Sequence, residues 1–201
     1  MAHHAQGPQS PLPVGEPPLQ GDARVLYRAI RKSILTSPDA FFMSQKEFGE
    51  KSVDYWRHEV QTATWAVIET REEVIGVAAA RHPDPDEDTD VDQHRARFIE
   101  SAWIVPRHRR RQKGTLLMTF LFEEERRRHP QVDEFLLWVF DDNESAKSFY
   151  EKMGFEYTDV SKKHGPSGRT ELRYRYMWDP DSIPASARTS PNETFRILNA
   201  E

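Results

Sequence analysis

The spacing of apolar positions changes repeatedly along the chain and predicts an alternation of helices and strands. A first helix is indicated by apolar residues three and four positions apart: Val25, Leu26, Ala29, Ile30 and Ile34. We expect it to end in "SPDAFF", because the residue before Pro38 disfavours the α conformation. A second helical segment is predicted from about residue 44 to residue 61. The stretches "TWAVIET" and "EVIGVAAARH" then predict two strands joined by a tight turn at residues 71–73.

The second half of the chain predicts three strand regions separated by two helices. "ARFIESAWIV" is typical of a strand, and a helix with one apolar face follows, ending in "RRRHP". "EFLLWVF" is almost continuously apolar, as in a central strand covered on both faces. "NESAKSFYEKMGF" predicts a short helix that stops at Gly154, and two last strands are expected at residues 155–160 and 170–178. This order predicts an α/β sandwich with a mixed sheet.

Length and composition predict one domain with two tails. The chain has 201 residues and 37% hydrophobic content, enough for one core. Residues 1–21 are rich in proline and are expected to be a flexible segment, residues 22–178 the folded domain, and residues 179–201 a second proline-containing tail. Within that tail "TFRIL" alternates apolar and polar residues, so it could dock as an extra strand, either on this chain or on another subunit of a homodimer.

Several classes of protein are excluded or disfavoured by what the sequence lacks. The chain has no cysteine, which rules out disulfides, thiolate metal sites and an acyl-enzyme on sulfur. No apolar run approaches the length of a membrane span, and the first residues do not resemble a signal peptide. We therefore expect a cytoplasmic protein that is not bound to a membrane. His3 and His4 are adjacent in a flexible segment, and no metal site is predicted.

A basic segment stands out against a formal net charge of −5. In "WIVPRHRRRQKGTLL", residues 107–113 carry five Lys or Arg side chains. Such a segment could contact nucleic acid, lie as a solvated surface or hold a phosphate. Its position between a predicted strand and a helix that opens near Gly114 favours the phosphate, because backbone N–H groups and the helix dipole converge there. Glycine would let the backbone approach the anion closely.

A second group of residues lies on the short helix after the central strand. Asn143 and Tyr150 are seven residues apart, so their side chains can lie along one face of a helix. On these residues alone, Asn143 could equally be a helix cap and Tyr150 a core aromatic residue.

Together these segments resemble the GCN5-related N-acetyltransferase (GNAT) superfamily. "NESAKSFYEKMGF" matches the family helix Asn-x-x-Ala-x-x-Phe-Tyr-x-x-x-Gly-Phe at every position from Asn143 to Phe155. In the phosphate loop Arg/Gln-x-x-Gly-x-Gly/Ala, Arg109 and Gly114 match, whereas Gln112 stands at the middle glycine. "SPDAFF" and "DYWRHEV" are similar to the first two helices of bacterial members. The resemblance covers about residues 22–178.

The resemblance implies a fold and a co-substrate. The fold would be a mixed, mostly antiparallel sheet flanked by about four helices, with acetyl-CoA as acetyl donor and no metal. The backbone amides of Ala102 and Ile104 would bond the pantetheine arm and the thioester carbonyl, and Asn143 would bind the same arm. The pyrophosphate would be held by the loop and the start of the helix: Arg109, Arg110, Arg111, Gln112, Lys113, Gly114 and Thr115.

Direct attack by an amine requires a base, since most amines are protonated at neutral pH. Glu100 is the candidate, because it shares strand parity with Ala102 and Ile104 and the family often uses a glutamate from this strand. The other interpretation of Glu100 is an ordinary salt bridge, and Asp39, Glu47 and Glu171 are alternatives. Tyr150 would protonate the departing thiolate, as the matching tyrosine does in the family. Without cysteine, an acetyl-cysteine route is closed.

The predicted function is acetyl transfer to a primary amine of a small, cationic molecule, with amine antibiotics among the candidates. The alternatives are a protein or peptide N-acetyltransferase and a degenerate GNAT module that binds CoA without catalysis. Binding to nucleic acid is disfavoured by the net acidity. The run "PDPDEDTDVD" carries six carboxylates that could attract a polycation, or it could be a solvated loop.

Overall fold

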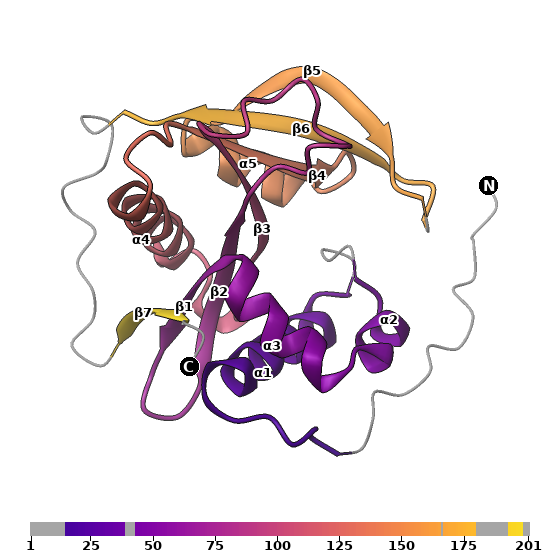
Figure 1. Cartoon of the computed structure of the whole chain (residues 1–201), viewed down its shortest axis with the longest axis vertical. Coiled ribbons are helices and arrows are strands. Elements are labelled where there is room, and N and C mark those ends of the chain that lie inside the picture. Colours follow the sequence, from indigo (N-terminus) through magenta and orange to yellow (C-terminus); the bar gives the residue numbers. More distant parts are fainter. Residues whose placement is uncertain (1–14, 39–42, 166, 180–192, 199–201) are drawn as a thin grey trace.

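A seven-stranded mixed sheet runs through the computed structural model and carries helices on both faces (Figure 1). The structure describes residues 15–38, 43–165, 167–179 and 193–198. The sheet order is β5-β6-β4-β3-β2-β1-β7, and all neighbours are antiparallel except β3 and β4. The strands are β1 (Thr64–Glu69), β2 (Val74–Arg81), β3 (Ala96–Ile104), β4 (Glu134–Phe140), β5 (Glu156–Lys163), β6 (Thr170–Met177) and β7 (Thr194–Leu198).

Five α-helices occur in the described part of the chain, where about four were expected: α1 (Gly21–Thr36), α2 (Gln45–Glu50), α3 (Val53–Thr62), α4 (Lys113–Arg128) and α5 (Glu144–Lys152). Helices α1, α2 and α3 form a group that packs against the β1–β3 part of the sheet, and α4 lies apart from them beside the same strands (Figure 1). None of the described helices is both long and apolar enough to cross a membrane.

The prediction of one helix from about residue 44 to residue 61 was wrong, because two serines start two separate helices. Ser44 and Glu47 form a capping box at the start of α2. Ser52 then caps α3 by accepting a hydrogen bond from the Tyr55 N–H at 3.1 Å. A cap residue has an extended backbone, so Ser52 interrupts the helical path.

The central feature of the sheet is the separation of β3 from β4. These parallel strands are paired only from Ala96 opposite Glu134 to Ile99 opposite Leu137. Beyond that point β3 continues along β2, whereas β4 continues along β6. Figure 1 shows β3 running from the β4–β6 part of the molecule to the part that carries α1, α2 and α3. The sheet is therefore splayed at its centre.

A β-bulge in β3 lies where the splay begins. Glu100 pairs with Ala79 and Trp103 with Val77, so two residues of β3 lie opposite one residue of β2. Ser101 takes a positive φ of 54°. The expectation that Glu100 shares strand parity with Ala102 and Ile104 was therefore wrong, because the extra residue shifts the alternation between them.

The segment "TFRIL" forms the strand that its alternation predicts, but on its own chain. β7 pairs with β1 in antiparallel orientation, with Ala66 opposite Ile197. Arg196 fastens it by ion pairs to Asp22 of α1 and, at 2.9 Å, to Glu69 of β1. The extra strand is therefore confirmed, and residues 194–198 of the expected tail belong to the sheet of their own chain.

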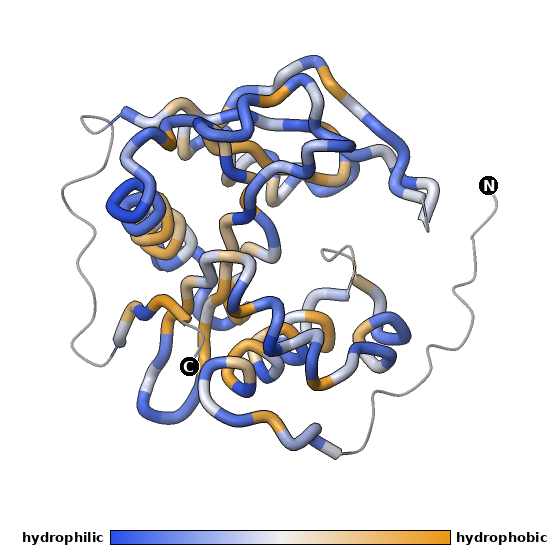
Figure 2. The backbone as a smooth tube through the Cα atoms, viewed as in Figure 1, coloured by the Kyte–Doolittle hydropathy of each residue, from blue (hydrophilic) through white to orange (hydrophobic). Residues whose placement is uncertain are grey.

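A buried ion pair joins the sheet to α4. The side chains of Arg97 in β3 and Glu125 in α4 are 1% and 2% exposed, and Arg97 Nε lies 3.0 Å from Glu125 Oε2. The helix presents a hydrophobic side inward and a hydrophilic side outward (Figure 2), so this pair is a charged contact within an otherwise apolar layer that includes Leu117, Leu121 and Phe122.

Replacing Glu125 with Gln should lower the free energy of unfolding by about 3–5 kcal/mol, because the Arg97 guanidinium would stay buried without a counter-charge. Urea denaturation followed by circular dichroism measures this loss. Glu124→Gln is the matched control, since Glu124 pairs with the exposed Arg127 and such pairs contribute about 0–1 kcal/mol. Similar losses in both variants would contradict the importance of the buried pair.

Candidate active site

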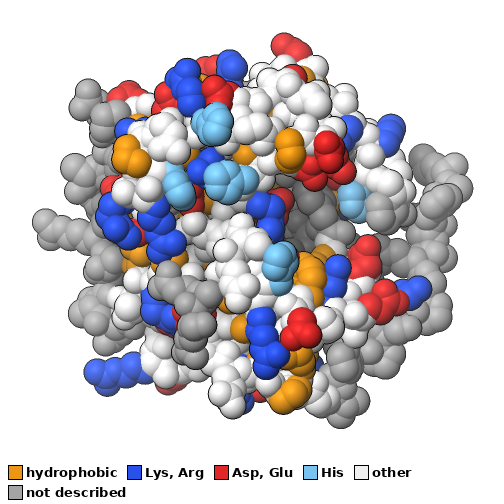
Figure 3. Space-filling model, in the orientation of Figure 1, with side chains coloured by type: hydrophobic (Ala, Val, Ile, Leu, Met, Phe, Trp, Pro, Cys, Tyr) orange, Lys and Arg blue, Asp and Glu red, His pale blue; other side chains and the backbone are white. Residues whose placement is uncertain are grey.

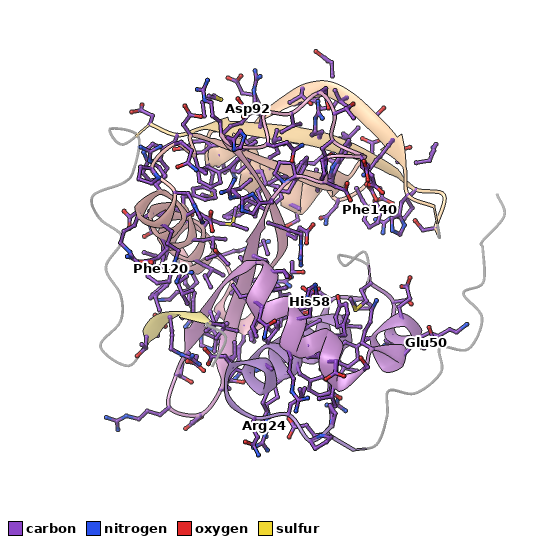
Figure 4. All side chains as sticks on the ribbon, in the orientation of Figure 1. Arg24, Glu50, His58, Asp92, Phe120 and Phe140 are labelled. Atoms are coloured by element: carbon purple, nitrogen blue, oxygen red, sulfur yellow. The ribbon has the colours of Figure 1, made fainter. Side chains whose placement is uncertain are left out.

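Three segments surround the splay of the sheet: the end of β3, the loop that leads into α4, and α5, which begins directly after β4. The space-filling view shows the surface hollowed between the β5–β6 part and the helical part of the molecule (Figure 3). In Figure 4, Phe140 at the end of β4 lies on the upper side of this region and His58 of α3 on the lower side. We built the candidate site from these segments.

The end of β3 directs backbone groups toward the space that β4 has left. The N–H of Val105 donates to the carbonyl of Ile75 in β2 at 2.9 Å. Because strand N–H groups alternate, those of Ile104 and Ala102 point away from β2. The carbonyl of Ile104 points the same way, since it accepts a hydrogen bond from Arg109 Nε at 2.9 Å. The splay thus exposes two peptide N–H groups of β3.

The loop before α4 contains two residues with a left-handed backbone. A one-turn 3-10 helix (Pro106–His108) leads into it. Gln112, at the position of the middle motif glycine, has φ 60° and ψ 3°, and Arg110 also has a positive φ of 58°. Glycine adopts this left-handed region most readily. Gln112 therefore departs from the motif in residue type, whereas its backbone conformation is the one that glycine favours.

Most of the basic side chains of the loop are bound within the protein. Arg109 donates to the Ile104 carbonyl and, at 2.7 Å, to Ser37 Oγ at the end of α1. Lys113 pairs with Glu193, and Arg107 pairs with Glu73. Arg110 and Arg111 are exposed, and no described residue forms an ion pair or hydrogen bond with their guanidinium groups. The phosphate-binding role expected of Arg109 and Lys113 would thus depend on their backbone groups.

Close packing of α4 against α5 requires a glycine at position 114, and the sequence did not reveal this requirement. A Cβ on this residue would lie 3.0 Å from Cζ of Phe149 in α5. The glycine was expected to give a phosphate access to the backbone, but the nearest constraint is the contact between α4 and α5. Thr115 follows it in the first turn of α4.

Asn143 caps α5, as one of its two interpretations required. Its Oδ1 accepts a hydrogen bond from the N–H of Ala146 at 3.2 Å. Gly154 has φ 92° and lies just beyond α5, as expected for a residue that stops a helix.

Tyr150 lies on α5 among apolar rings, with centroids 5.3 Å from Phe149 and 5.6 Å from Phe155. Burial raises the pKa of the Tyr150 hydroxyl to about 12, because the charged phenolate would be poorly solvated there. Like any tyrosine hydroxyl, it is protonated at neutral pH and can donate a hydrogen bond.

Glu100 takes part in a network that includes a second carboxylate. Glu100 Oε2 accepts from Arg81 Nε at 3.1 Å, and Arg81 Nη2 donates to Glu59 Oε2 of α3 at 2.6 Å. Tyr55 is also hydrogen-bonded to Glu59, and burial together with this carboxylate raises the pKa of the Tyr55 hydroxyl. The salt bridge expected as the alternative interpretation of Glu100 is present. With 46% of its side chain exposed, the carboxylate remains accessible.

Sequence reasoning missed Arg81, Glu59 and Tyr55, which come from β2 and α3. A usable signal was the charge at the end of the apolar strand "VIGVAAAR". The partner of that charge could not be found by spacing, because Glu59 lies on a different element.

The other carboxylates proposed as bases lie in different settings. Asp39 falls outside the described residues. Glu47 accepts from the N–H of Ser44 at 2.7 Å, and this hydrogen bond lowers the pKa of its carboxyl group. Glu171 in β6 is 3% exposed, and burial raises the pKa of its carboxyl group.

The acidic run between β2 and β3 is partly engaged in its own loop. Asp90 forms an ion pair with Arg173 of β6 at 2.5 Å, and Asp92 accepts from the N–H groups of His94 and Arg95. Asp88 accepts from the N–H of Asp84. These contacts favour the interpretation as a loop over that of a free acidic field. The described residues also contain no group of three His, Cys, Asp or Glu that could hold a metal ion.

Several solved structures share this fold at low sequence identity. NAA60 from Arabidopsis thaliana, solved with a bisubstrate analogue, is 15% identical with a TM-score of 0.56, over 76% of this chain and 94% of that one. Ribosomal-protein-alanine N-acetyltransferase from Brucella melitensis is 18% identical with a TM-score of 0.56, over 78% of this chain and 94% of that one. The structure of yncA from Salmonella typhimurium, solved with acetyl-CoA, is 14% identical with a TM-score of 0.58, over 84% of this chain and 96% of that one. At such identities these similarities show the fold alone.

The sequence itself also matches a family. A comparison with curated protein sequences finds no match. The family model described as "Acetyltransferase (GNAT) family" matches residues 31–155, which is more than half of the chain. This range includes the splayed end of β3, the loop before α4, and α5. The chain therefore belongs to the acetyltransferase (GNAT) family.

Proposed function

We propose that this acyltransferase moves an acetyl group directly from acetyl-CoA to a primary amine of a small, cationic molecule, a class that includes amine antibiotics. The observation that carries the proposal is the splay between β3 and β4, where the N–H groups of Ala102 and Ile104 face away from β2. Acetyl-CoA supplies an acetyl group activated as a thioester. The two N–H groups suit a carbonyl oxygen on which negative charge develops.

The residues before and within the first turn of α4 fit a diphosphate. The N-terminus of α4 directs unpaired N–H groups toward the loop, and the helix dipole favours an anion there. The exposed guanidinium groups of Arg110 and Arg111 add two positive charges beside it. We assign the backbone from Arg110 to Thr115 to the pyrophosphate, and the amide nitrogen of Asn143, whose oxygen caps α5, to the pantetheine arm.

Glu100 and Tyr150 would divide the proton transfers. Glu100 takes a proton from the amine as its nitrogen bonds to the carbonyl carbon, and Arg81 holds the carboxylate in place. As the carbon–sulfur bond breaks, the Tyr150 hydroxyl gives its proton to the sulfur. The hydroxyl is protonated at neutral pH, as this role requires, and its pKa of about 12 makes it a weaker acid than an ordinary tyrosine.

The charge around Glu100 supports a cationic acceptor. Glu59 and Glu100 share the single guanidinium of Arg81, which leaves one negative charge in excess. Such a field attracts a protonated amine. Protein or peptide amines remain the alternative acceptor class, and CoA binding without transfer is a further alternative.

The acceptor class is tested by measuring CoA thiol release with polyamines, aminoglycosides, hydrophobic monoamines and peptides. We expect the highest kcat/KM with small cationic amines. A higher kcat/KM with peptides would show that the acceptor is a peptide or protein amine and not a small cationic molecule. Acetyl-CoA binding without thiol release from any amine would support the degenerate module instead.

Replacing Glu100 with Gln should lower kcat/KM by roughly 10² or more, while the Kd for acetyl-CoA stays nearly unchanged, because the variant loses the base only. Tyr150→Phe should instead lower kcat. Glu156→Gln, on the exposed surface of β5, is the matched control and should retain activity. A Glu100→Gln enzyme as active as the control would exclude Glu100 as the base.

Gln112→Gly should preserve or tighten acetyl-CoA binding, measured by calorimetry, and should raise the free energy of unfolding by up to about 1 kcal/mol. Gln112 has a left-handed backbone, which costs a non-glycine residue about 1–2 kcal/mol. Glycine removes this cost, but its greater loss of backbone entropy on folding offsets about 0.5–1 kcal/mol of the gain. Gln131→Gly makes the same change at an exposed loop residue without a positive φ and should be destabilising. Much weaker acetyl-CoA binding by Gln112→Gly would show that the Gln112 side chain contacts the ligand.

A further inference from the structure

A lysine of the protein itself is bound between an aromatic ring and a carboxylate near the splay. The ammonium of Lys162 in β5 lies 4.3 Å from the centroid of the Trp138 ring in β4. It also lies 3.9 Å from Oε2 of Glu171 in β6. A cation over an indole ring is stabilised by the electrons of the ring, and a carboxylate adds a direct charge interaction. This arrangement has the chemistry of a binding site for an ammonium group.

Glu171 is poorly paired for a buried carboxylate. Its side chain is 4% exposed, and the ion pair with Lys162 is longer than a hydrogen bond. No described residue donates a hydrogen bond to its carboxylate oxygens. Burial accordingly raises the pKa of the Glu171 carboxyl group, although Lys162 and His164 act against the rise. A cation that approached this carboxylate closely would therefore gain more than it would from an exposed one.

The strand register places this pair beside the candidate base. Ile99 lies opposite Leu137, so the next residues, Glu100 and Trp138, are neighbours across the start of the splay. Trp138 packs on the same face of the sheet as Phe98. Glu100 lies on this face too, because it is two residues after Phe98 and precedes the bulge. Glu171 is one strand further on, in β6. Glu171 lies opposite Phe140, two residues beyond Trp138, and β3 and β4 diverge here, so Glu100 and Glu171 are separated by at least two strand spacings, at least about 10 Å.

We propose that Trp138 and Glu171 form a subsite for a second cationic group of the acceptor, and that Lys162 occupies this subsite until the acceptor displaces it. The inference rests on the proposed function and narrows the acceptor to amines that carry two positive charges at least about 10 Å apart. One ammonium group would lose its proton to Glu100, and the other would stay charged on Trp138 and Glu171.

Lys162 is the cation of this cluster that can leave. Its side chain is 45% exposed and lies on β5, an edge strand of the sheet. Arg173 also lies over Trp138, at 5.8 Å, but Asp90 holds its guanidinium at 2.5 and 3.0 Å. Displacing Lys162 exposes its ammonium to water, where it is well solvated, so the exchange costs little.

The test compares octylamine with diaminooctane, which has the same chain and a second amine, in acetyl transfer and in calorimetric binding. Diaminobutane is the length control, because its ammonium groups are too close to span two strands. In Glu171→Gln, kcat/KM for diaminooctane should fall about tenfold, and the value for octylamine should change less than twofold. Lys162→Met should raise kcat/KM for diaminooctane and leave kcat/KM for octylamine unchanged, because the substitution removes the ammonium group that occupies the subsite.

Trp138→Phe provides a further variant if Glu171→Gln does not fold. It should also lower kcat/KM for diaminooctane, because phenylalanine binds cations less well than tryptophan. Asp86→Asn removes one exposed charge from the loop before β3 and should affect neither amine. Equal effects of the subsite variants on octylamine and diaminooctane would overturn the subsite and leave the proposed function intact. If neither amine is acetylated, the proposed function fails, and binding of diaminooctane no tighter than octylamine would then reject the subsite as well.

Discussion

The short pairing of β3 with β4 is the constraint on which the other features of the site depend. After four paired positions the strands diverge, and the N–H groups of β3 that would have continued the ladder face open space. A buried peptide group without a partner is costly, so a structure keeps such groups only where something else can bond them. The positive φ of Ser101 and the bulge turn β3 away from β4 at this point. The loop and helix that complete the site then gather around the opening.

The two sides of the splay differ in their chemistry. On the side of α4 and α5, the helix N-terminus, the exposed Arg110 and Arg111, which no described residue pairs, and the Tyr150 hydroxyl suit an anion and a leaving group. On the side of α3, the carboxylates of Glu59 and Glu100 suit an amine. Under the proposed function, this separation of charge would let the donor and the acceptor approach the same opening in the sheet from opposite faces.

Several charged side chains near the site form ion pairs or cation–π contacts with other side chains of the protein. Arg81 is shared by two carboxylates, Lys113 by Glu193 of the C-terminal segment, and Lys162 by Trp138 and Glu171. Such contacts fix side chains that would otherwise be free, at the cost of their availability to ligands. Arg109 is the clearest case, because its Nε and Nη2 groups join the end of β3 to the end of α1.

The family, the order of elements and the residues of the motif helix could be predicted from local signals, because apolar spacing and caps act over a few neighbouring positions. Asn143 and Gly154, for example, could be placed at the two ends of α5 from such signals. The bulge at Ser101, the contact of Gly114 with Phe149 and the placement of "TFRIL" on β1 of the same chain became evident from the structure. It alone also brought together Glu100, Arg81 and Glu59, since these contacts join residues from separate elements and no local pattern encodes the distance between them.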